Sequence, residues 1–279
     1  MLRYDIVDVF AEGPFAGNQL AVVHGAAGLG DDQLLALARE FAFSETTFPT
    51  PVADDRYRVR IFTPGGEIPF AGHPTLGTAW VLRETGLLAA DEVVQECAAG
   101  EVRVRLAGDL AELSAVPRDL VGPLDEDTVA GVLAAVGLDL GDRDGDAWLA
   151  GTGLTFVHVP VTEGAVARAR VASALPSLPD TADPVGGIAV HALGPDLAVH
   201  LRVFVPELAV PEDPATGSAA TGLGMALRAR GLATTGSSYR IRQGAEIGRP
   251  SLLLGTVGAD EIRVAGRVHA IARGEIRVP

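Results

Sequence analysis

Lysine is missing from this sequence of 279 residues, and all 22 basic residues are arginine. Without a lysine amine the chain cannot form a Schiff base, which excludes ordinary pyridoxal-phosphate chemistry. A phosphate-binding loop of the Walker type is excluded for the same reason, because its motif needs the lysine. Cys97 is the single cysteine, so an internal disulfide, a zinc ribbon and any mechanism that uses two thiols of the chain are excluded too.

Basic charge is also scarce, with 22 Lys plus Arg against 36 Asp plus Glu and a net charge of −14. A chain this acidic offers no basic stripe to neutralise phosphates, so we expect no nucleic-acid partner. No apolar run reaches the ~20 residues that span a bilayer, so we expect no membrane partner. Residues 1–10 contain acids where a signal peptide needs an apolar core, and this pattern predicts a cytoplasmic protein.

Two common motifs are absent as well. The sequence has no Gly-x-Ser-x-Gly elbow, and no Gly-x-Gly-x-x-Gly follows a predicted strand, which excludes serine-hydrolase and Rossmann interpretations. Five scattered histidines show no metal-ligand spacing, and we interpret them as structural or surface groups. They are His24, His158, His191, His200 and His269. We therefore predict neither a metal nor another cofactor.

What the sequence does contain is an internal repeat. Residues 60–64 (RIFTP) return as 202–206 (RVFVP), and residues 67–72 (EIPFAG) return as 212–217 (EDPATG). The match continues without a gap to a Gly-Leu pair at the end of each copy, and a three-residue insertion separates the two blocks in the second copy. An ordered set of matches of this kind indicates two homologous domains.

Each copy has the same local pattern. A β-branched stretch (57–62 and 199–205) predicts a strand, and a loop rich in Pro and Gly follows it. The next segments, 74–82 and 219–227, are almost entirely apolar or small, and a helix that is apolar on all sides must be buried. The sequence therefore predicts an α+β fold of two pseudo-symmetric domains, each a β-sheet wrapped around a central buried helix.

The ends of these elements can be predicted too. Pro74 is expected at the first helical position of the first buried helix, and Ser218 as the N-cap of the second. Both helices should stop at a C′ glycine, Gly86 and Gly231. Surface helices are expected at 31–42 and 126–137, and further strands at 2–10, 20–23, 92–96, 101–106 and 262–268. Two domains are predicted, at residues 1–117 and 118–269, and the joint between them is expected near 116–119. The C-terminal strand 270–279 is a candidate to complete the first domain.

The two buried helices lead to a candidate site. A helix N-terminus has unpaired N–H groups and a partial positive charge, so two such ends suit an anionic group such as a carboxylate. His73 lies at the first helix start and Asp213 precedes the second. Glu45 lies between hydroxyls and aromatics, and a carboxyl in partly apolar surroundings can carry a proton at neutral pH. This set suits the removal of a proton at one carbon and its return at another.

Taken singly, each of these residues has a structural explanation. Glu45 suits an exposed strand, His73 a helix cap, Asp213 a turn before proline, and Ser218 an N-cap. The repeat favours functional roles for the last three, because it places them at equivalent helix starts. The repeat gives no such support for a functional role of Glu45.

Four blocks of the sequence resemble the phenazine-biosynthesis PhzF-like family, in the family's order and over nearly the whole chain. They are residues 8–18 (DVF, then PFAGN), 44–48 (SETTF), 60–75 (RIFTP to GHPT) and 212–219 (EDPATGSA). The resemblance implies a diaminopimelate-epimerase-like fold without a cofactor, an active site between the two domains and a homodimer. Gln19 and Ala71 depart from the family pattern and could change the pocket.

The resemblance also implies roles for individual residues. In the phenazine enzyme, the residue that matches Glu45 moves a proton within a dihydro-hydroxyanthranilate. His73 and Asp213 would assist this catalysis. Family relatives that are epimerases use a cysteine at each helix start, and this chain has no cysteine there. The residues expected to bind substrate or line the cleft are Asn18, Ser44, Gly72, Gly217 and Ser218.

We therefore expect a cofactor-independent isomerase that acts on a small carboxylated substrate, of the trans-2,3-dihydro-3-hydroxyanthranilate isomerase type. Two alternatives stay open. One is a racemase or epimerase of an amino-acid-like compound, which would invert a stereocentre rather than move a double bond. The other is a non-catalytic ligand-binding protein of the same fold.

Overall fold

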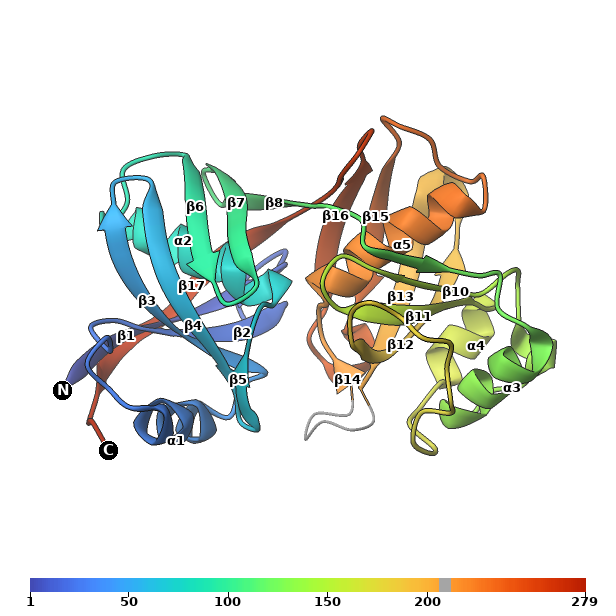
Figure 1. The fold of residues 1–279 in the computed structure, drawn as a ribbon, viewed down its shortest axis with the longest axis horizontal. Coiled ribbons are helices and arrows are strands. Elements are labelled where there is room, and N and C mark those ends of the chain that lie inside the picture. Colours follow the sequence, from blue (N-terminus) through green and yellow to red (C-terminus); the bar gives the residue numbers. More distant parts are fainter. Residues whose placement is uncertain (206–211) are drawn as a thin grey trace. The chain divides into compact units, whose positions relative to one another are not determined.

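The computed structural model describes residues 1–205 and 212–279, which divide into two compact units (Figure 1). Unit 1 comprises Met1–Ser114 and Ala265–Pro279, and unit 2 comprises Ala115–Val264. Both units are rich in strands and hold few helices, which confirms the expected mixed, sheet-rich fold. Pro206, the last residue of the repeated RVFVP motif, and the insertion after it lie outside the described residues.

The strands of unit 1 pair in a closed ring. They are β1 (Leu2–Val9), β2 (Asn18–Val23), β3 (Glu45–Ala53), β4 (Arg56–Thr63), β5 (Gly66–Ile68), β6 (Glu92–Cys97), β7 (Gly100–Ala107), β8 (Leu110–Ala115) and β17 (Ile262–Ile276). β1 pairs antiparallel with β2, β2 runs parallel to β3, and β3 pairs antiparallel with β4. β4 runs parallel to β6, and β6 to β8 form an antiparallel meander. β17 pairs with both β8 and β1 and thereby closes the ring.

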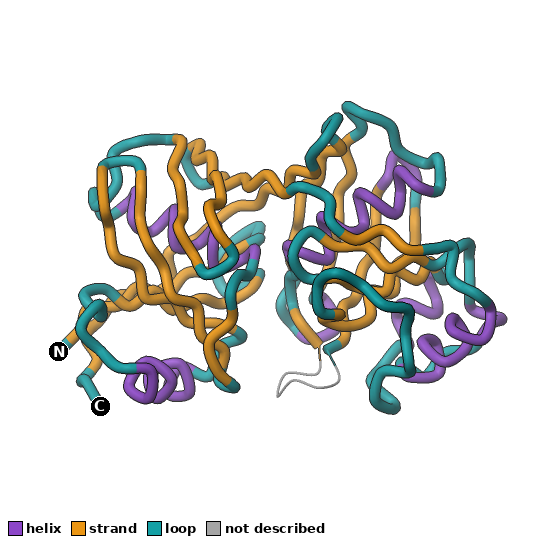
Figure 2. Tube along the Cα trace, viewed as in Figure 1, coloured by secondary structure: helices purple, strands orange, loops and turns teal. Residues whose placement is uncertain are grey.

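The helix α2 (Gly72–Glu84) is enclosed by these strands (Figure 2). All but one of its residues from Gly72 to Leu82 are buried, which confirms the prediction from its apolar composition. The helix approaches the sheet closely at Gly77, where an added Cβ would lie 2.6 Å from Leu20 and 2.7 Å from Val9. It ends, as predicted, before a C′ glycine in the left-handed conformation, Gly86, with φ 72°.

The outer face of unit 1 is covered by the amphipathic helix α1 (Asp31–Phe41), which the sequence predicted at 31–42. Its Leu34 and Leu37 pack in an apolar cluster with Phe48 and Phe62 from the strands below. Side chains alternate across a strand, so residues 45 and 47 of β3 lie on the face opposite to Phe48. The Thr47 hydroxyl lies 2.8 Å from that of Thr78 on α2, which identifies this opposite face as the interior of the ring.

Unit 2 is also built from a strongly curved set of strands and a buried helix, α5 (Gly217–Ala229). Its strands are β9 (Asp119–Val121), β10 (Trp148–Gly151), β11 (Thr155–Pro160), β12 (Val185–Leu193), β13 (Ala198–Phe204), β14 (Glu212–Asp213), β15 (Ser238–Gln243) and β16 (Ser251–Val257). They pair in the order β9-β10-β11-β12-β13-β15-β16, with β11–β12 and β13–β15 parallel. The short strand β14 pairs with the end of β13.

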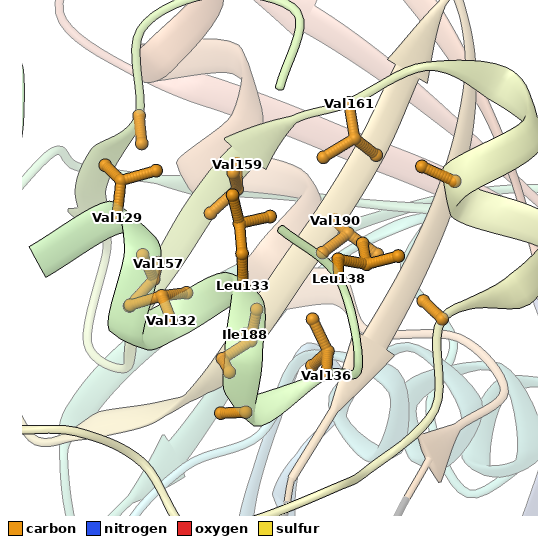
Figure 3. Close-up of a cluster of buried hydrophobic side chains, with 14 of the residues drawn as sticks. Val129, Val132, Leu133, Val136, Leu138, Val157, Val159, Val161, Ile188 and Val190 are labelled. Atoms are coloured by element: carbon orange, nitrogen blue, oxygen red, sulfur yellow. The ribbon is translucent and has the colours of Figure 1, made fainter. Parts of the chain in front are cut away.

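The outer face of unit 2 carries two further helices, α3 (Glu126–Ala135) and α4 (Glu163–Arg168). Valines and leucines of α3 pack on the strands β11 and β12, as Figure 3 shows around Leu133 and Val159. The described part of the unit also contains three short 3-10 helices: η1 (Leu140–Asp142), η2 (Pro195–Leu197) and η3 (Ala245–Ile247). The prediction of a surface helix at 126–137 is confirmed by α3.

Two predicted helix starts were wrong. The helix α2 begins at Gly72 with Ala71 as N-cap, so Pro74 is its third residue rather than its first. Proline is tolerated there because none of the first four N–H groups has an intrahelical partner. The helix α5 begins at Gly217, and its N-cap is Thr216 rather than Ser218. Gly72 and Gly217 adopt helical geometry, and each helix therefore begins two residues earlier than predicted.

Candidate active site

Four of the predicted site residues come together in unit 1: Asn18, Ser44, Glu45 and His73. Parallel pairing of β2 with β3 sets Leu20 opposite Glu45, so the first residues of the two strands lie at the same edge. The α2 helix begins inside the ring at this edge, and His73 is its second residue. The side chain of His73 is 4% exposed and that of Glu45 is 15% exposed, so the group is largely shielded from water.

A chain of hydrogen bonds fixes the orientation of the imidazole. The Ser44 hydroxyl donates to Asn18 Oδ1 at 3.0 Å, and Asn18 Nδ2 lies 3.4 Å from His73 Nδ1. On the other side of the ring, His73 Nε2 lies 3.3 Å from the main-chain oxygen of Gln19. A carbonyl oxygen can only accept, so Nε2 carries the proton and Nδ1 presents a lone pair. Burial lowers the pKa of His73 to about 3, against an opposing effect of the Gln19 carbonyl. The ring is therefore neutral at pH 7.

Glu45 lies against the unprotonated nitrogen of this ring. Its Oε2 is 3.2 Å from His73 Nδ1. An ionised carboxylate would direct a second lone pair at Nδ1, whereas a protonated carboxyl can donate its O–H to the same nitrogen. The contact is thus favourable when one proton lies between Glu45 and His73. A carboxyl group held in this way can give a proton to a substrate or take one from it.

In unit 2 a second group of polar residues surrounds the start of α5. Thr216 donates its hydroxyl proton to Asp213 Oδ2 at 2.5 Å. Gln243 Nε2 donates to the Asp213 carbonyl at 2.7 Å and to Thr216 Oγ1 at 3.0 Å, and Gln243 Oε1 accepts from the Thr216 N–H at 3.2 Å. Gly217 and Ser218 are the first two residues of the helix. The Asp213 carboxylate is therefore held at a helix N-terminus, where negative charge is favoured.

The structure thus distributes the predicted residues over both units. Glu45, His73, Asn18 and Ser44 form one contiguous group, with Gly72 next to His73 at the start of α2. The other predicted residues belong to the group in unit 2: Asp213, Gly217 and Ser218.

Sequence reasoning missed Gln243 altogether. A signal for it existed, because β15 alternates strictly between exposed and buried residues. Tyr239, Ile241 and Gln243 are the three buried members of the strand. A polar side chain at an inward position of a strand is informative, since buried polar groups need partners.

Four other histidines lie outside these two groups of residues. His158 and His191 are buried neighbours in unit 2, with ring centroids 6.4 Å apart. His24 contacts Asp5 at 2.8 Å, and His200 contacts both Glu163 and Glu246 at 2.7 Å. Within residues 1–205 and 212–279, no three histidine, cysteine or acidic side chains are grouped so that they could hold a metal ion.

A cavity of about 460 Å³ lies on the outer face of unit 1. It is lined by Cys97, Phe48 and Arg60 among others. Glu45 and His73 are not among the residues that line it. Among the described residues, no helix has the length and apolar character that a bilayer crossing demands.

A family model described as "Phenazine biosynthesis-like protein" matches residues 7–274. The chain belongs to this family. It is 34% identical over 284 residues to trans-2,3-dihydro-3-hydroxyanthranilate isomerase of Pseudomonas aeruginosa, covering 98% of this chain and 99% of the relative. An uncharacterised isomerase of Pasteurella multocida is also 34% identical, over 99% of this chain and 94% of the relative.

Solved structures give the same result. A protein of Pseudomonas aeruginosa described as a predicted epimerase superposes with a TM-score of 0.84 at 32% identity, covering 99% of both chains. The sequence-based assignment to the PhzF-like family is therefore confirmed. The named relatives are isomerases, and isomerase is the enzyme class that they support for this member of the phenazine biosynthesis-like family.

Proposed function

We propose that the chain is a cofactor-independent isomerase in which Glu45 carries the transferred proton. The observation that carries this proposal is the contact of 3.2 Å between Glu45 Oε2 and the unprotonated nitrogen of the buried His73. In this reaction Glu45 takes a proton from one carbon of an unsaturated substrate and returns it to another carbon, so the double bond moves and Glu45 recovers its starting state. In the interval the protonated Glu45 donates a hydrogen bond to Nδ1 of the neutral His73, and Asn18 keeps the ring in place.

The substrate that we propose is a small carboxylated compound of the trans-2,3-dihydro-3-hydroxyanthranilate type. The relatives of that name, at 34% identity over nearly the whole chain, support this choice. The start of α2 has no acidic residue in its first turn, which suits the binding of a carboxylate. Ser44 and Ser218, with Gly72 and Gly217, are proposed as substrate-binding residues, and Asp213 as a further catalytic group.

We also propose that the two units are pseudo-symmetric, epimerase-like domains, with boundaries close to 1–117 and 118–269. In support, each unit buries one helix of 13 residues that ends at a C′ glycine. Each also pairs the arginine of the repeat with the glutamate of the next block, Arg60 with Glu67 and Arg202 with Glu212. A homodimer and a cytoplasmic location remain proposals that rest on the family resemblance and on composition.

Turnover of trans-2,3-dihydro-3-hydroxyanthranilate, followed by NMR, tests the proposed function. The wild type should shift the double bond and give an isomerised product of the same mass. Glu45→Gln should be inactive, while Glu40→Gln, on the exposed face of α1, should retain wild-type activity as a matched control. A wild type that leaves this compound and related carboxylates unchanged would refute the proposal. Inversion of a stereocentre without a double-bond shift would support the racemase alternative instead.

A further inference from the structure

Arg202 makes an unusually complete set of contacts next to the proposed site. The residue lies on β13 and is 6% exposed. Its Nε and Nη2 donate to the two carboxylate oxygens of Glu212 at 2.8 and 2.7 Å. Its Nη1 donates to the main-chain oxygens of Val166 and Ala169, at 3.0 and 2.7 Å. One guanidinium therefore ties the strand β14, which contains Glu212, to β13 and to the C-terminal end of α4.

The repeat provides an internal comparison. In unit 1, Arg60 Nε and Nη2 bind both oxygens of Glu67 at 2.8 and 2.5 Å, in the same fork-like geometry. Arg60 lies 5.1 Å from the ring of Phe62, and Arg202 lies 4.9 Å from the ring of the aromatic residue two positions further on. The two arginines thus make the same kinds of side-chain contact within their repeats.

The two pairs differ in their burial. The side chains of Arg60 and Glu67 are 38% and 39% exposed, whereas those of Arg202 and Glu212 are 7% and 10% exposed. Arg60 also donates a hydrogen bond to Asp31 on the surface. Arg202 instead donates to buried main-chain oxygens. An exposed pair suffices to hold this turn in unit 1. Burial of an ion pair carries a large desolvation penalty, so the turn alone does not explain the buried pair in unit 2.

The two ion pairs also differ in the residue that follows the glutamate. The residue after Glu67 is Ile68, whereas the residue after Glu212 is Asp213. Among the described residues, the strand β14 consists of Glu212 and Asp213, which pair with the last two residues of β13. The Arg202–Glu212 pair adds two charge-assisted hydrogen bonds next to these pairings, and it thereby restrains the chain on that side of Asp213. Gln243 holds the Asp213 carbonyl from the other side.

From this difference we infer that Arg202 and Glu212 are positioning residues, which hold the Asp213 carboxylate at the start of α5 for the reaction. Neither residue is a catalytic residue in this inference; both act through Asp213. The inference rests on the proposed function, in which Asp213 takes part. A carboxylate that moves by about 1 Å can lose on the order of 100-fold in rate, so the expected effect is large compared with that of a surface pair.

A double-mutant cycle on Glu212→Gln and Asp213→Asn tests this inference. Glu212→Gln should lower kcat by about 10- to 100-fold and change KM by less than about 3-fold. The same substitution should have no further effect on kcat once Asp213→Asn is present, because the residue it positions is already disabled. Glu67→Gln, the matched control in unit 1, should leave kcat within about 2-fold of the wild type.

Additive losses in the cycle would overturn the inference, since a purely structural loss acts in both backgrounds. An effect of Glu212→Gln no larger than that of Glu67→Gln would overturn it too. If Glu212→Gln does not fold, Arg202→Lys is combined with Asp213→Asn in the same double-mutant cycle. This substitution keeps the positive charge but removes the two parallel hydrogen bonds of the guanidinium to Glu212. A wild type without turnover would refute the proposed function instead. In that case a crystal structure of Glu212→Gln decides the positioning inference. A displaced Asp213 carboxylate would support the inference, and an unchanged Thr216–Asp213 contact of 2.5 Å would contradict it.

Discussion

Acid should destabilise this protein before most of its carboxylates titrate, because three imidazoles are buried in it as neutral groups. Burial lowers the pKa of His73, His158 and His191 to about 3, from an ordinary value of 6.5. As the pH falls below 6.5, the unfolded chain takes up three protons that the folded chain does not bind. Folding stability is therefore present above pH 6.5 and is lost progressively as the pH falls towards 3.

The size of the loss follows from the linkage relation. Between pH 7 and pH 5 each of these histidines removes about 2 kcal/mol from the free energy of unfolding, or about 6 kcal/mol for all three. Native proteins are stable by only about 5–15 kcal/mol in total. The two histidines of unit 2 account for about 4 kcal/mol of this change.

The assay uses one tryptophan in each unit, Trp80 on α2 and Trp148 on β10. In a Trp80→Phe background, the fluorescence of Trp148 follows urea unfolding of unit 2 at pH 7, 6 and 5. The parent should lose about 4 kcal/mol between pH 7 and pH 5, and a variant with His158→Gln and His191→Gln should lose little. Because the pH 5 value is subtracted from the pH 7 value within each protein, any structural cost of the substitutions cancels. Equal losses in parent and variant would refute the reasoning.

Two further predictions concern unit 1. Phe15 is 74% exposed and has φ 65°, a left-handed conformation that asparagine adopts more readily than phenylalanine. Phe15→Asn should therefore raise the free energy of unfolding in urea by about 0.5–1 kcal/mol; a lower value would mean that the aromatic ring contributes packing that its exposure hides. Asn18→Leu should lower the free energy of unfolding by about 1–3 kcal/mol and reduce turnover, because the Ser44 hydroxyl loses its acceptor and the His73 ring loses one of the contacts that orient it. An unchanged urea midpoint would show that the hydrogen-bond chain through Asn18 is not needed.

The buried helices were the most predictable part of the fold. Their sequences have no polar stripe, and a helix of that kind has only one stable location, inside a wall of strands. Their C′ glycines could be placed too, because Gly86 and Gly231 stand where a left-handed residue is needed. The N-termini could not be placed as well. Capping preference favoured Ser218, but Gly217 can adopt helical geometry, and the hydroxyl of the true N-cap, Thr216, donates to Asp213 instead.

The candidate site was only partly predictable. The repeat favoured His73 and Asp213, because it placed both near equivalent helix starts. It offered nothing for Glu45, which is 28 positions from His73 in the sequence. The contact between them depends on the parallel pairing of β2 with β3, which brings Glu45 to the edge where α2 begins. Such a contact between distant segments leaves no trace in local periodicity, and only the family resemblance pointed to it.

The proton that Glu45 is proposed to carry can be followed directly. The wild type and Glu45→Gln are each incubated in deuterated water with trans-2,3-dihydro-3-hydroxyanthranilate, and the product is analysed by NMR and mass spectrometry. We expect the wild type to give isomerised product with deuterium at the carbon that receives the proton. We expect Glu45→Gln to be slower by at least the ~10²–10⁴-fold that loss of a general acid–base group causes, with its fold intact by circular dichroism. Isomerisation and deuterium uptake by Glu45→Gln at the wild-type rate would contradict the proposed role of Glu45.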